Sequence, residues 1–222
     1  MSTAFGLDFG TSNSSLSVNR DGSVELLDID KDSPIQMSLK SVLYFLKDRQ
    51  GIKPYIGHEA IEKYIETEAA GRYMQSIKTF LPDPTFHKTE IFNKSYELEE
   101  LISFFLRTVK MRGERFIDAE VSSVVLGRPV LFSEDAESDR LAETRLEAAA
   151  RLAGFNEILF QAEPVAAALS FENNLACGEE KIVLVGDFGA GTSDFTILKA
   201  RKTDQVRLDR SADILATEGV YI

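Results

Sequence analysis

Apolar and polar residues alternate along the first part of the chain in the pattern of a β meander. Residues 5–9 and 16–18 carry the first two apolar stretches, and residues 24–29 follow a turn at "NRDG", where Gly22 can adopt positive φ. The run "SVLYFL", residues 41–46, predicts a further strand. The chain is therefore expected to begin with antiparallel strands.

The spacing of apolar residues becomes helical after Gly57. The segments "GHEAIEKYIE" (57–66) and "YELEELISFFLRTVKMRGERF" (96–116) repeat apolar residues every three or four positions, which predicts two amphipathic helices. Between them, "LPDPTFHKTEIF" contains two prolines and predicts a loop with a short extended piece.

An α/β pattern begins at Val121. Strand "VSSVVLGRP" precedes a helix over residues 134–153 that Gly154 closes, and strand "EILFQ" precedes a helix opened by Pro164. A helix between two strands is typical of a crossover connection, so these strands are expected to lie parallel in the same sheet as the first hairpin.

The last part of the chain repeats the beginning. After a boundary expected at "CGEEK" (177–181), strands are predicted at "IVLVGDFG", "SDFTILKAR" and "QVRLDRSAD", an echo at an interval of about 180 residues that indicates two duplicated lobes. We expect a first lobe over residues 1–177, with an inserted helical subdomain at about 48–118, and the start of a second lobe over 178–222. Because no helix follows to cover its last sheet, the second lobe is expected to be cut short.

Composition excludes several classes of function. The chain has 222 residues, of which 44% are apolar, and a formal net charge of −11, which repels phosphate backbones and anionic lipid surfaces. Neither nucleic acid nor a membrane is therefore an expected partner. The single Cys177 cannot form an internal disulfide, and the N-terminus lacks a signal-peptide pattern, so a cytoplasmic location is expected.

Two turns combine an aspartate with small residues. Asp8 precedes Gly10-Thr11-Ser12, and Asp187 precedes Gly189-Ala190-Gly191-Thr192, so backbone N–H groups at each turn can approach a phosphate closely. A carboxylate about 5 Å from a phosphate oxygen repels it by roughly 3 kcal/mol at an effective dielectric of 20, and a magnesium ion between them reverses the sign. One such turn alone is read more simply as an ordinary tight turn, but the pair predicts a magnesium-dependent phosphate site.

Other phosphate motifs are absent from the sequence. "GAGTSD" lacks the third glycine of a dinucleotide fingerprint and leads into a predicted strand, and no Gly-Lys dipeptide exists to form a P-loop. "DFG" occurs twice, but the catalytic loop and the lysine strand of protein kinases are missing.

Five segments together resemble the ATPase domain of the 70-kilodalton heat-shock (DnaK-like) chaperones. In order they are "GLDFGTSNSSLSV", "SIKTFLP", "GRPVLF", "LAGFNEILFQAEPVAAALSFE" and "VLVGDFGAGTSDFTILKA". "QSIKTFLPDPTF" and "YELEELISFFLR" are more similar to the divergent YegD-like putative chaperones. The resemblance implies an α/β actin-like ATPase domain of the actin and hexokinase-like superfamily, with a ribonuclease H-like motif, present as the first lobe and the first strands of the second.

The resemblance also implies roles for individual residues. Asp8 and Asp187 would orient magnesium-bound water, Lys78 would position the attacking water, Glu163 would help order metal and water, and Asp194 would lie near a bound cation. The residues implied in phosphate contact are Gly10, Thr11, Ser12, Gly189, Ala190, Gly191 and Thr192.

Taken one at a time, these residues have plainer interpretations. Lys78 alone would be a surface lysine, Glu163 an acid at a helix N-terminus, and Asp194 an acid beside a turn. Pro129 alone would end a strand, whereas the resemblance makes it a relay of the nucleotide state.

The implied function is binding of ATP or ADP with Mg²⁺, with K⁺ as a further cation, and slow hydrolysis of ATP in a longer parent protein. Lobe closure would be coupled to co-chaperones or unfolded clients, and the present chain alone is expected to be inactive. A nucleotide-sensing interaction protein and a small-molecule kinase of the same superfamily remain alternatives, although Lys78 disfavours the kinase.

Two departures from the family pattern stand out. Ala190 replaces a family glycine, at a cost of about 1 kcal/mol if that position needs a left-handed backbone. Glu143 falls near the position where main-branch members carry an arginine that reports to the substrate-binding domain, which puts conventional coupling in doubt.

Overall fold

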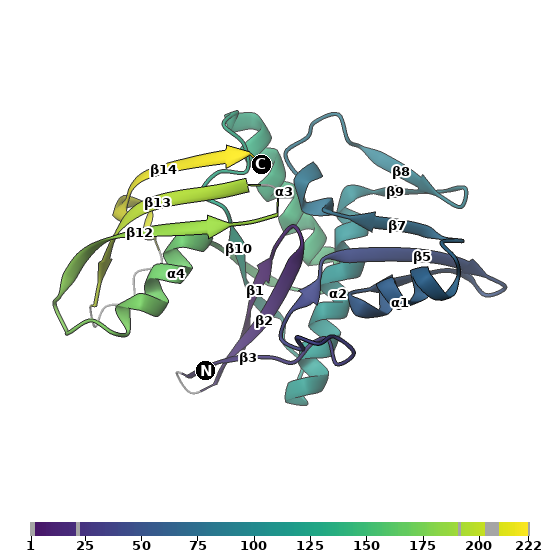
Figure 1. Ribbon diagram of the computed structural model, residues 1–222, viewed down its shortest axis with the longest axis horizontal. Coiled ribbons are helices and arrows are strands. Elements are labelled where there is room, and N and C mark those ends of the chain that lie inside the picture. Colours follow the sequence, from purple (N-terminus) through teal and green to yellow (C-terminus); the bar gives the residue numbers. More distant parts are fainter. Residues whose placement is uncertain (1–2, 21–22, 191, 203–208, 222) are drawn as a thin grey trace. The chain divides into compact units, whose positions relative to one another are not determined.

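The computed structural model describes residues 3–20, 23–190, 192–202 and 209–221 (Figure 1). Contacts divide the chain into two compact units. The first comprises Met1–Leu126 and Leu131–Leu159, and the second comprises Gly127–Val130 and Phe160–Ile222. The predicted lobe boundary at residue 177 and the predicted inserted subdomain come from sequence patterns, and this division by contacts does not test them, so both remain predictions.

A mixed sheet forms the centre of the first unit. Its strands are β1 (Ala4–Phe9), β2 (Asn13–Arg20), β3 (Ser23–Leu26), β4 (Leu39–Lys40), β10 (Ser123–Arg128) and β11 (Glu157–Ala162). The order is β11-β10-β1-β2-β3, with β4 also paired to β2. Strand β1 is antiparallel to β2 and parallel to β10, so the predicted opening hairpin and the parallel crossover strand are both confirmed.

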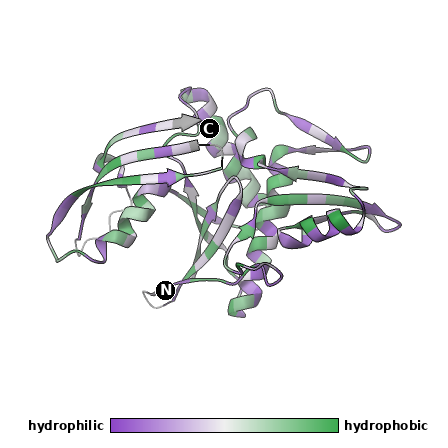
Figure 2. Cartoon of the chain, viewed as in Figure 1, coloured by the Kyte–Doolittle hydropathy of each residue, from purple (hydrophilic) through white to green (hydrophobic). Residues whose placement is uncertain are grey.

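Helix α2 (Leu98–Ile117) lies on this sheet, and α3 (Ala136–Leu152) packs on α2 (Figure 1). The approach of α2 is close at Gly113, where a Cβ atom would lie 2.4 Å from Cδ2 of Leu16. Helix α3 ends before Gly154, which has φ of 99°, as the sequence predicts. Apolar residues concentrate on α2 and the neighbouring strands, which form the core (Figure 2).

A smaller antiparallel sheet and a hairpin complete the first unit. The sheet contains β5 (Val42–Asp48), β6 (Gly51–Ile56) and β7 (Arg72–Gln75), with α1 (His58–Glu66) packed on β5 and β6. The 3-10 helix η1 (Ile77–Phe80) follows β7, and β8 (Lys88–Ile91) pairs with β9 (Lys94–Glu97). The predicted helices and the predicted strand at 41–46 are confirmed, whereas β6, β7 and β9 were not predicted.

The second unit places one helix on a three-stranded antiparallel sheet. It contains α4 (Glu163–Glu172), β12 (Glu180–Phe188), β13 (Thr192–Arg201), η2 (Ser211–Asp213) and β14 (Ile214–Tyr221). Val183 and Val185 pack against a buried cluster that includes Ala168 of α4. The expectation that no helix covers this sheet is therefore wrong for one face. On the other face Ile182, Leu184 and Phe188 are 68%, 65% and 75% exposed.

The third strand of this sheet was predicted too early, at residues 205–213. Residues 205–208 lie outside the described part of the chain, and residues 211–213 form η2, so the third strand is β14 instead. Local hydrogen bonds explain η2, because the Asp209 carboxylate accepts from both the amide and the hydroxyl of Ser211 and starts a turn.

Within the described residues, no helix combines the length and apolar character needed to cross a membrane.

A buried ion cluster joins α4, β13 and η2. The carboxylate of Glu172 accepts from Nη2 of Arg210 at 2.7 Å and from the backbone amide of Arg201 at 2.8 Å, and Asp213 accepts from both arginines. Burial alone would raise the pKa of Glu172, but the hydrogen bonds from Arg210 and Arg201 outweigh it and leave the pKa below its usual value.

The substitution Glu172→Gln should therefore destabilise the second unit by about 1–3 kcal/mol at pH 7, the scale of hydrogen bonds to charged groups. A lowered pKa makes this stabilisation complete above the ordinary carboxyl pKa and lost as the pH falls through the lowered value. Urea denaturation from pH 7 to pH 3 should show the gap between variant and wild type closing in acid. The exposed Glu180→Gln is the control, and an equal loss in both variants at pH 7 would contradict the assignment.

Candidate functional site

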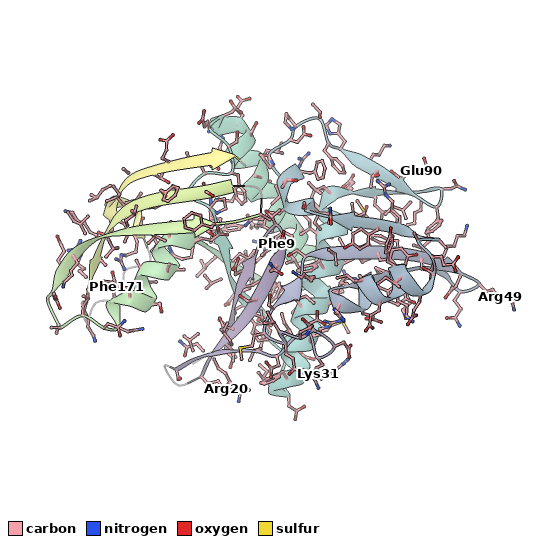
Figure 3. All side chains as sticks on the ribbon, in the orientation of Figure 1. Phe9, Arg20, Lys31, Arg49, Glu90 and Phe171 are labelled. Atoms are coloured by element: carbon pink, nitrogen blue, oxygen red, sulfur yellow. The ribbon has the colours of Figure 1, made fainter. Side chains whose placement is uncertain are left out.

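The first Asp-Gly turn is a hairpin between β1 and β2. Asp8 is paired with Ser15, and Phe9 with Ser14, so the connecting turn runs from Gly10 through Ser12. The Asp8 side chain is exposed, whereas Phe9, labelled in Figure 3, is fully buried and packs on Phe105 of α2 with ring centroids 5.4 Å apart. The core thus fixes the strand that carries Asp8.

Gly10 is required by space rather than by backbone conformation. A Cβ atom at this position would lie 2.3 Å from the backbone oxygen of Asn13, and backbone cannot yield as a flexible side chain does. The described glycines with positive φ are Gly51, Gly57, Gly154 and Gly178, and Gly10 is not among them. The turn therefore closes tightly on itself.

Ser41 anchors this turn to the next part of the chain. Its amide donates to the backbone oxygen of Ser12 at 2.9 Å, and its hydroxyl is 2.9 Å from the hydroxyl of Ser14. Ser14 and Ser41 are 1% and 2% exposed, so this hydroxyl pair is shielded from water. Two contacts from one residue hold the turn in place.

Ser41 also lies next to the strand whose partner precedes Lys78 in the chain. Val42, next to Ser41, is paired with Gln75 at the end of β7, and Ser76 then takes a left-handed conformation with φ of 56° before η1 begins. Lys78 is half-buried on η1, and its neighbours Ile77 and Leu81 are buried. The segment that carries Lys78 is therefore connected to the first hairpin through Ser41 and its neighbour Val42.

The second Asp-Gly turn has the same construction. Asp187 is paired with Asp194, and Phe188 with Ser193, which reproduces the pairing of Asp8 with Ser15 and of Phe9 with Ser14. The two hairpins therefore have turns of equal length.

The small residues of this second turn are described in part. Gly189 and Ala190 are exposed, Gly191 lies outside the described residues, and Thr192 begins β13. Ala190 is not among the described non-glycine residues with positive φ, so the cost expected for a left-handed alanine does not apply.

The opposition of Asp187 and Asp194 brings two carboxylates to the same face of the sheet. Gly219 of β14 is paired with Asp194 on its other side, and a Cβ at Gly219 would lie 2.6 Å from Oδ1 of Asp194. The carboxylate of Asp194 therefore occupies the space that the missing side chain leaves. Like charges placed directly opposite one another destabilise a sheet unless a cation or a donor compensates them.

Two further predicted residues lie at the start of the second unit. Glu163 is the first residue of α4, where the partial positive charge of the helix N-terminus stabilises a carboxylate, and Pro164 beside it is buried. Pro129 lies in the segment after β10, and its backbone oxygen accepts from Nε of Arg128 at 3.1 Å.

The predicted site residues thus fall into two sets. The first unit contains Asp8, Gly10, Thr11, Ser12 and Lys78, and the second contains Glu163, Asp187, Gly189, Ala190, Thr192 and Asp194. Among the described residues, no group of three or more histidine, cysteine or acidic side chains is arranged to hold a metal.

Sequence reasoning missed Ser14 and Ser41, which contact the first turn, and Arg145, whose guanidinium group binds backbone oxygens just after Lys78. Arg145 could have been found, because it occupies the apolar stripe of α3 formed by Ala142, Leu146 and Ala149.

A mixed sheet with two matching Asp-Gly hairpins is consistent with an actin-like ATPase domain. The chain belongs to the Hsp70 family, whose model, described as Hsp70 protein, matches residues 46–205. It is similar to the chaperone protein DnaK of Thermotoga neapolitana, with 31% identity over 215 residues that cover 96% of this chain and 32% of that relative.

Two other relatives give the same result. The chaperone protein DnaK of Thermotoga petrophila is 32% identical over 195 residues, covering 87% of this chain and 30% of the relative. The chaperone protein HscA homolog of Tolumonas auensis is 29% identical over 215 residues, covering 88% and 32%. The chain spans about a third of the length of these curated relatives.

The close contact at Gly10 predicts that Gly10→Ala destabilises the first unit by about 1–3 kcal/mol, the usual cost of overpacking. The control is Gly186→Ala, whose Cβ would meet the ring of Phe188 at 3.2 Å, because that exposed ring can move aside. Urea denaturation of the chain measures both, and equal midpoints for the two variants would show that the turn can relax.

Proposed function

We propose that this chain is the first part of an ATP-binding, ATP-hydrolysing domain of an Hsp70-type chaperone, and that its two Asp-Gly hairpins bind the phosphates of ATP. The identical pairing in the two hairpins carries the proposal, since it gives each unit an aspartate followed by a turn of the same length. The similarity to chaperone proteins DnaK and HscA supports it.

The residues present fit a magnesium ion held through water. Asp187 and Asp194 place two carboxylates on one face, and Gly219 leaves room for one of them. Hydrated Mg²⁺ prefers such oxygen ligands and usually keeps several of its waters. When bound, the magnesium nucleotide supplies the phosphoryl group and a divalent charge. Asp8, Asp187 and Asp194 would hold the hydrated ion through its water molecules, the cation would offset the repulsion between the carboxylates, and K⁺ is a second candidate cation for Asp194.

In this proposal, Lys78 supplies a positive charge from the first unit to the phosphates of ATP. Phosphoryl transfer to water depends mainly on positioning and charge neutralisation, and an ammonium group held on a fixed 3-10 turn provides both. Glu163 is proposed to order water from the N-terminus of α4, where the partial positive charge of the helix favours a carboxylate.

The chaperone relatives suggest the wider role. We propose that nucleotide-driven closure of the two lobes is coupled to unfolded client proteins or co-chaperones in the cytoplasm. Glu143 on α3 falls near the position at which main-branch members carry an arginine, which favours a coupling different from theirs.

Lys78→Ala in the full-length protein should lower the single-turnover rate of ATP hydrolysis by about 100-fold or more, while the dissociation constant of ATP changes by less than about threefold. Quenched-flow release of phosphate and calorimetry measure the two quantities. The control is Lys88→Ala on the exposed face of β8. An unchanged hydrolysis rate in Lys78→Ala would assign the chemistry to another residue. If the wild-type protein releases no phosphate, the alternative function of a nucleotide-sensing interaction protein is favoured.

Asp187→Asn should weaken the dependence of nucleotide binding on magnesium, because one carboxylate of the opposed pair is lost. Titration of Mg²⁺ at fixed ATP should give an apparent affinity lower by about tenfold, with binding of free ATP at least as tight as in wild type. The matched control is Glu180→Gln, an exposed acid on the same strand. A magnesium titration equal to that of wild type would contradict the role of Asp187.

A further inference from the structure

Arg145 is a buried arginine in the apolar stripe of α3. Its side chain is 8% exposed, and its neighbours on that stripe are Ala142, Leu146 and Ala149. A charged side chain in such a position is costly unless its donors are satisfied. The partners of Arg145 therefore show why it is there.

The guanidinium group binds the backbone of a single loop. Nη1 donates to the backbone oxygens of Phe80 at 3.3 Å, Leu81 at 3.1 Å and Asp83 at 2.8 Å. Nη2 donates to the oxygen of Phe86 at 2.7 Å, and Nε lies 3.5 Å from Oε1 of Glu99 on α2. Four carbonyl groups and a carboxylate thus surround one side chain.

The loop is itself ordered around this contact. The Asp83 carboxylate accepts from the amide and hydroxyl of Thr85 at 2.8 and 2.7 Å, which holds the pKa of Asp83 below its usual range. The rings of Phe80 and Phe86 lie 5.0 Å apart. These contacts turn the carbonyl groups of the loop toward α3.

This loop continues directly from the 3-10 turn that carries Lys78. Phe80 is the last residue of η1, and the amide of Leu81 donates to the backbone oxygen of Lys78 at 3.1 Å. Ile77 and Leu81, on either side of Lys78, are buried. The guanidinium group therefore fixes the backbone two and three residues after Lys78.

We propose that Arg145 is a positioning residue that sets the place of Lys78 through the loop at residues 80–86. The proposal rests on the proposed role of Lys78 in hydrolysis. Only a planar guanidinium presents enough donors in a fixed plane for four carbonyls, whereas a lysine ammonium has three donors on a flexible stem. The contact between α3 and η1 is thus specific for arginine.

The first test measures the loop itself in the 222-residue chain. In Arg145→Lys, amide hydrogen exchange of Thr79, Leu81, Asp83 and Phe86 should become faster by about tenfold or more, because each amide closes a turn of this segment. Exchange in β1 should not change. The control is Arg140→Lys, an exposed position on the same helix.

A second variant covers the case in which Arg145→Lys does not fold. Glu99→Gln leaves the guanidinium in place and should accelerate the same amides by a smaller factor. Exchange at these amides equal to that of wild type in the folded variants would overturn the proposal.

The second test uses a double-mutant cycle in the full-length protein. Arg145→Lys should lower the single-turnover hydrolysis rate by about 10- to 100-fold with the ATP dissociation constant within about twofold, as a displaced catalytic group does. In the Lys78→Ala background the same change should cost less than about threefold, since Arg145 acts through Lys78. If Arg145→Lys still lowers the hydrolysis rate by about 10- to 100-fold in the Lys78→Ala background, the proposal is overturned.

The two tests separate the positioning role from the proposed function. If wild-type protein releases no phosphate, hydrolysis is wrong, while hydrogen exchange still decides whether Arg145 holds the segment that carries Lys78.

Discussion

The parallel pairing of β1 with β10 is the constraint on which the first unit depends. It joins Ala4 to Ser123 and Leu7 to Leu126, and with β2 on its other side it makes β1 a central strand. A central strand has backbone partners along both edges, so its end cannot shift without breaking two ladders. Asp8 directly follows Leu7, the last residue of β1 that is paired with β10, so the first hairpin extends from a segment that is paired on both sides.

Hydrophobic periodicity predicted the elements that bury one face. Helix α2 and strand β1 have regular apolar stripes because each covers the core from one side. Strands β6 and β7 escaped prediction because "GIKPYI" contains proline and lysine, and "RYMQ" is short with no buried residue. The last strand was misplaced since "QVRLDR" alternates more clearly than "ILATEGVY". Hydrophobic periodicity indicates which residues are buried, whereas β6, β7 and β14 are defined mainly by their backbone pairing with neighbouring strands.

The candidate site also contains residues that the sequence could predict and contacts that it could not. Asp8 and Asp187 could be proposed from the sequence as a pair, because two aspartates followed by small residues in matching turns indicate a phosphate site, whereas Lys78 was implied only by the family resemblance. Ser41 could not be proposed in this way, because it contacts a backbone atom of a segment distant in the chain. Arg145 stands out in its apolar stripe, but the carbonyl groups that it binds could not be predicted. A contact to a carbonyl group depends on where the loop runs and not on which side chains it carries, so it leaves little trace in the sequence.

The opposition of Asp187 and Asp194 shows how the fold accommodates this site. Two carboxylates paired across a hairpin repel each other, and a sheet selected for stability alone would place a residue of opposite charge or an apolar residue at one of them. Gly219 adds to the cost, because glycine weakens a strand interior, yet it leaves the space that the Asp194 carboxylate occupies. In the first hairpin the residue opposite Asp8 is the neutral Ser15, so the repulsion is confined to the second unit. The cation dependence that we propose should accordingly arise more from Asp187 and Asp194 than from Asp8.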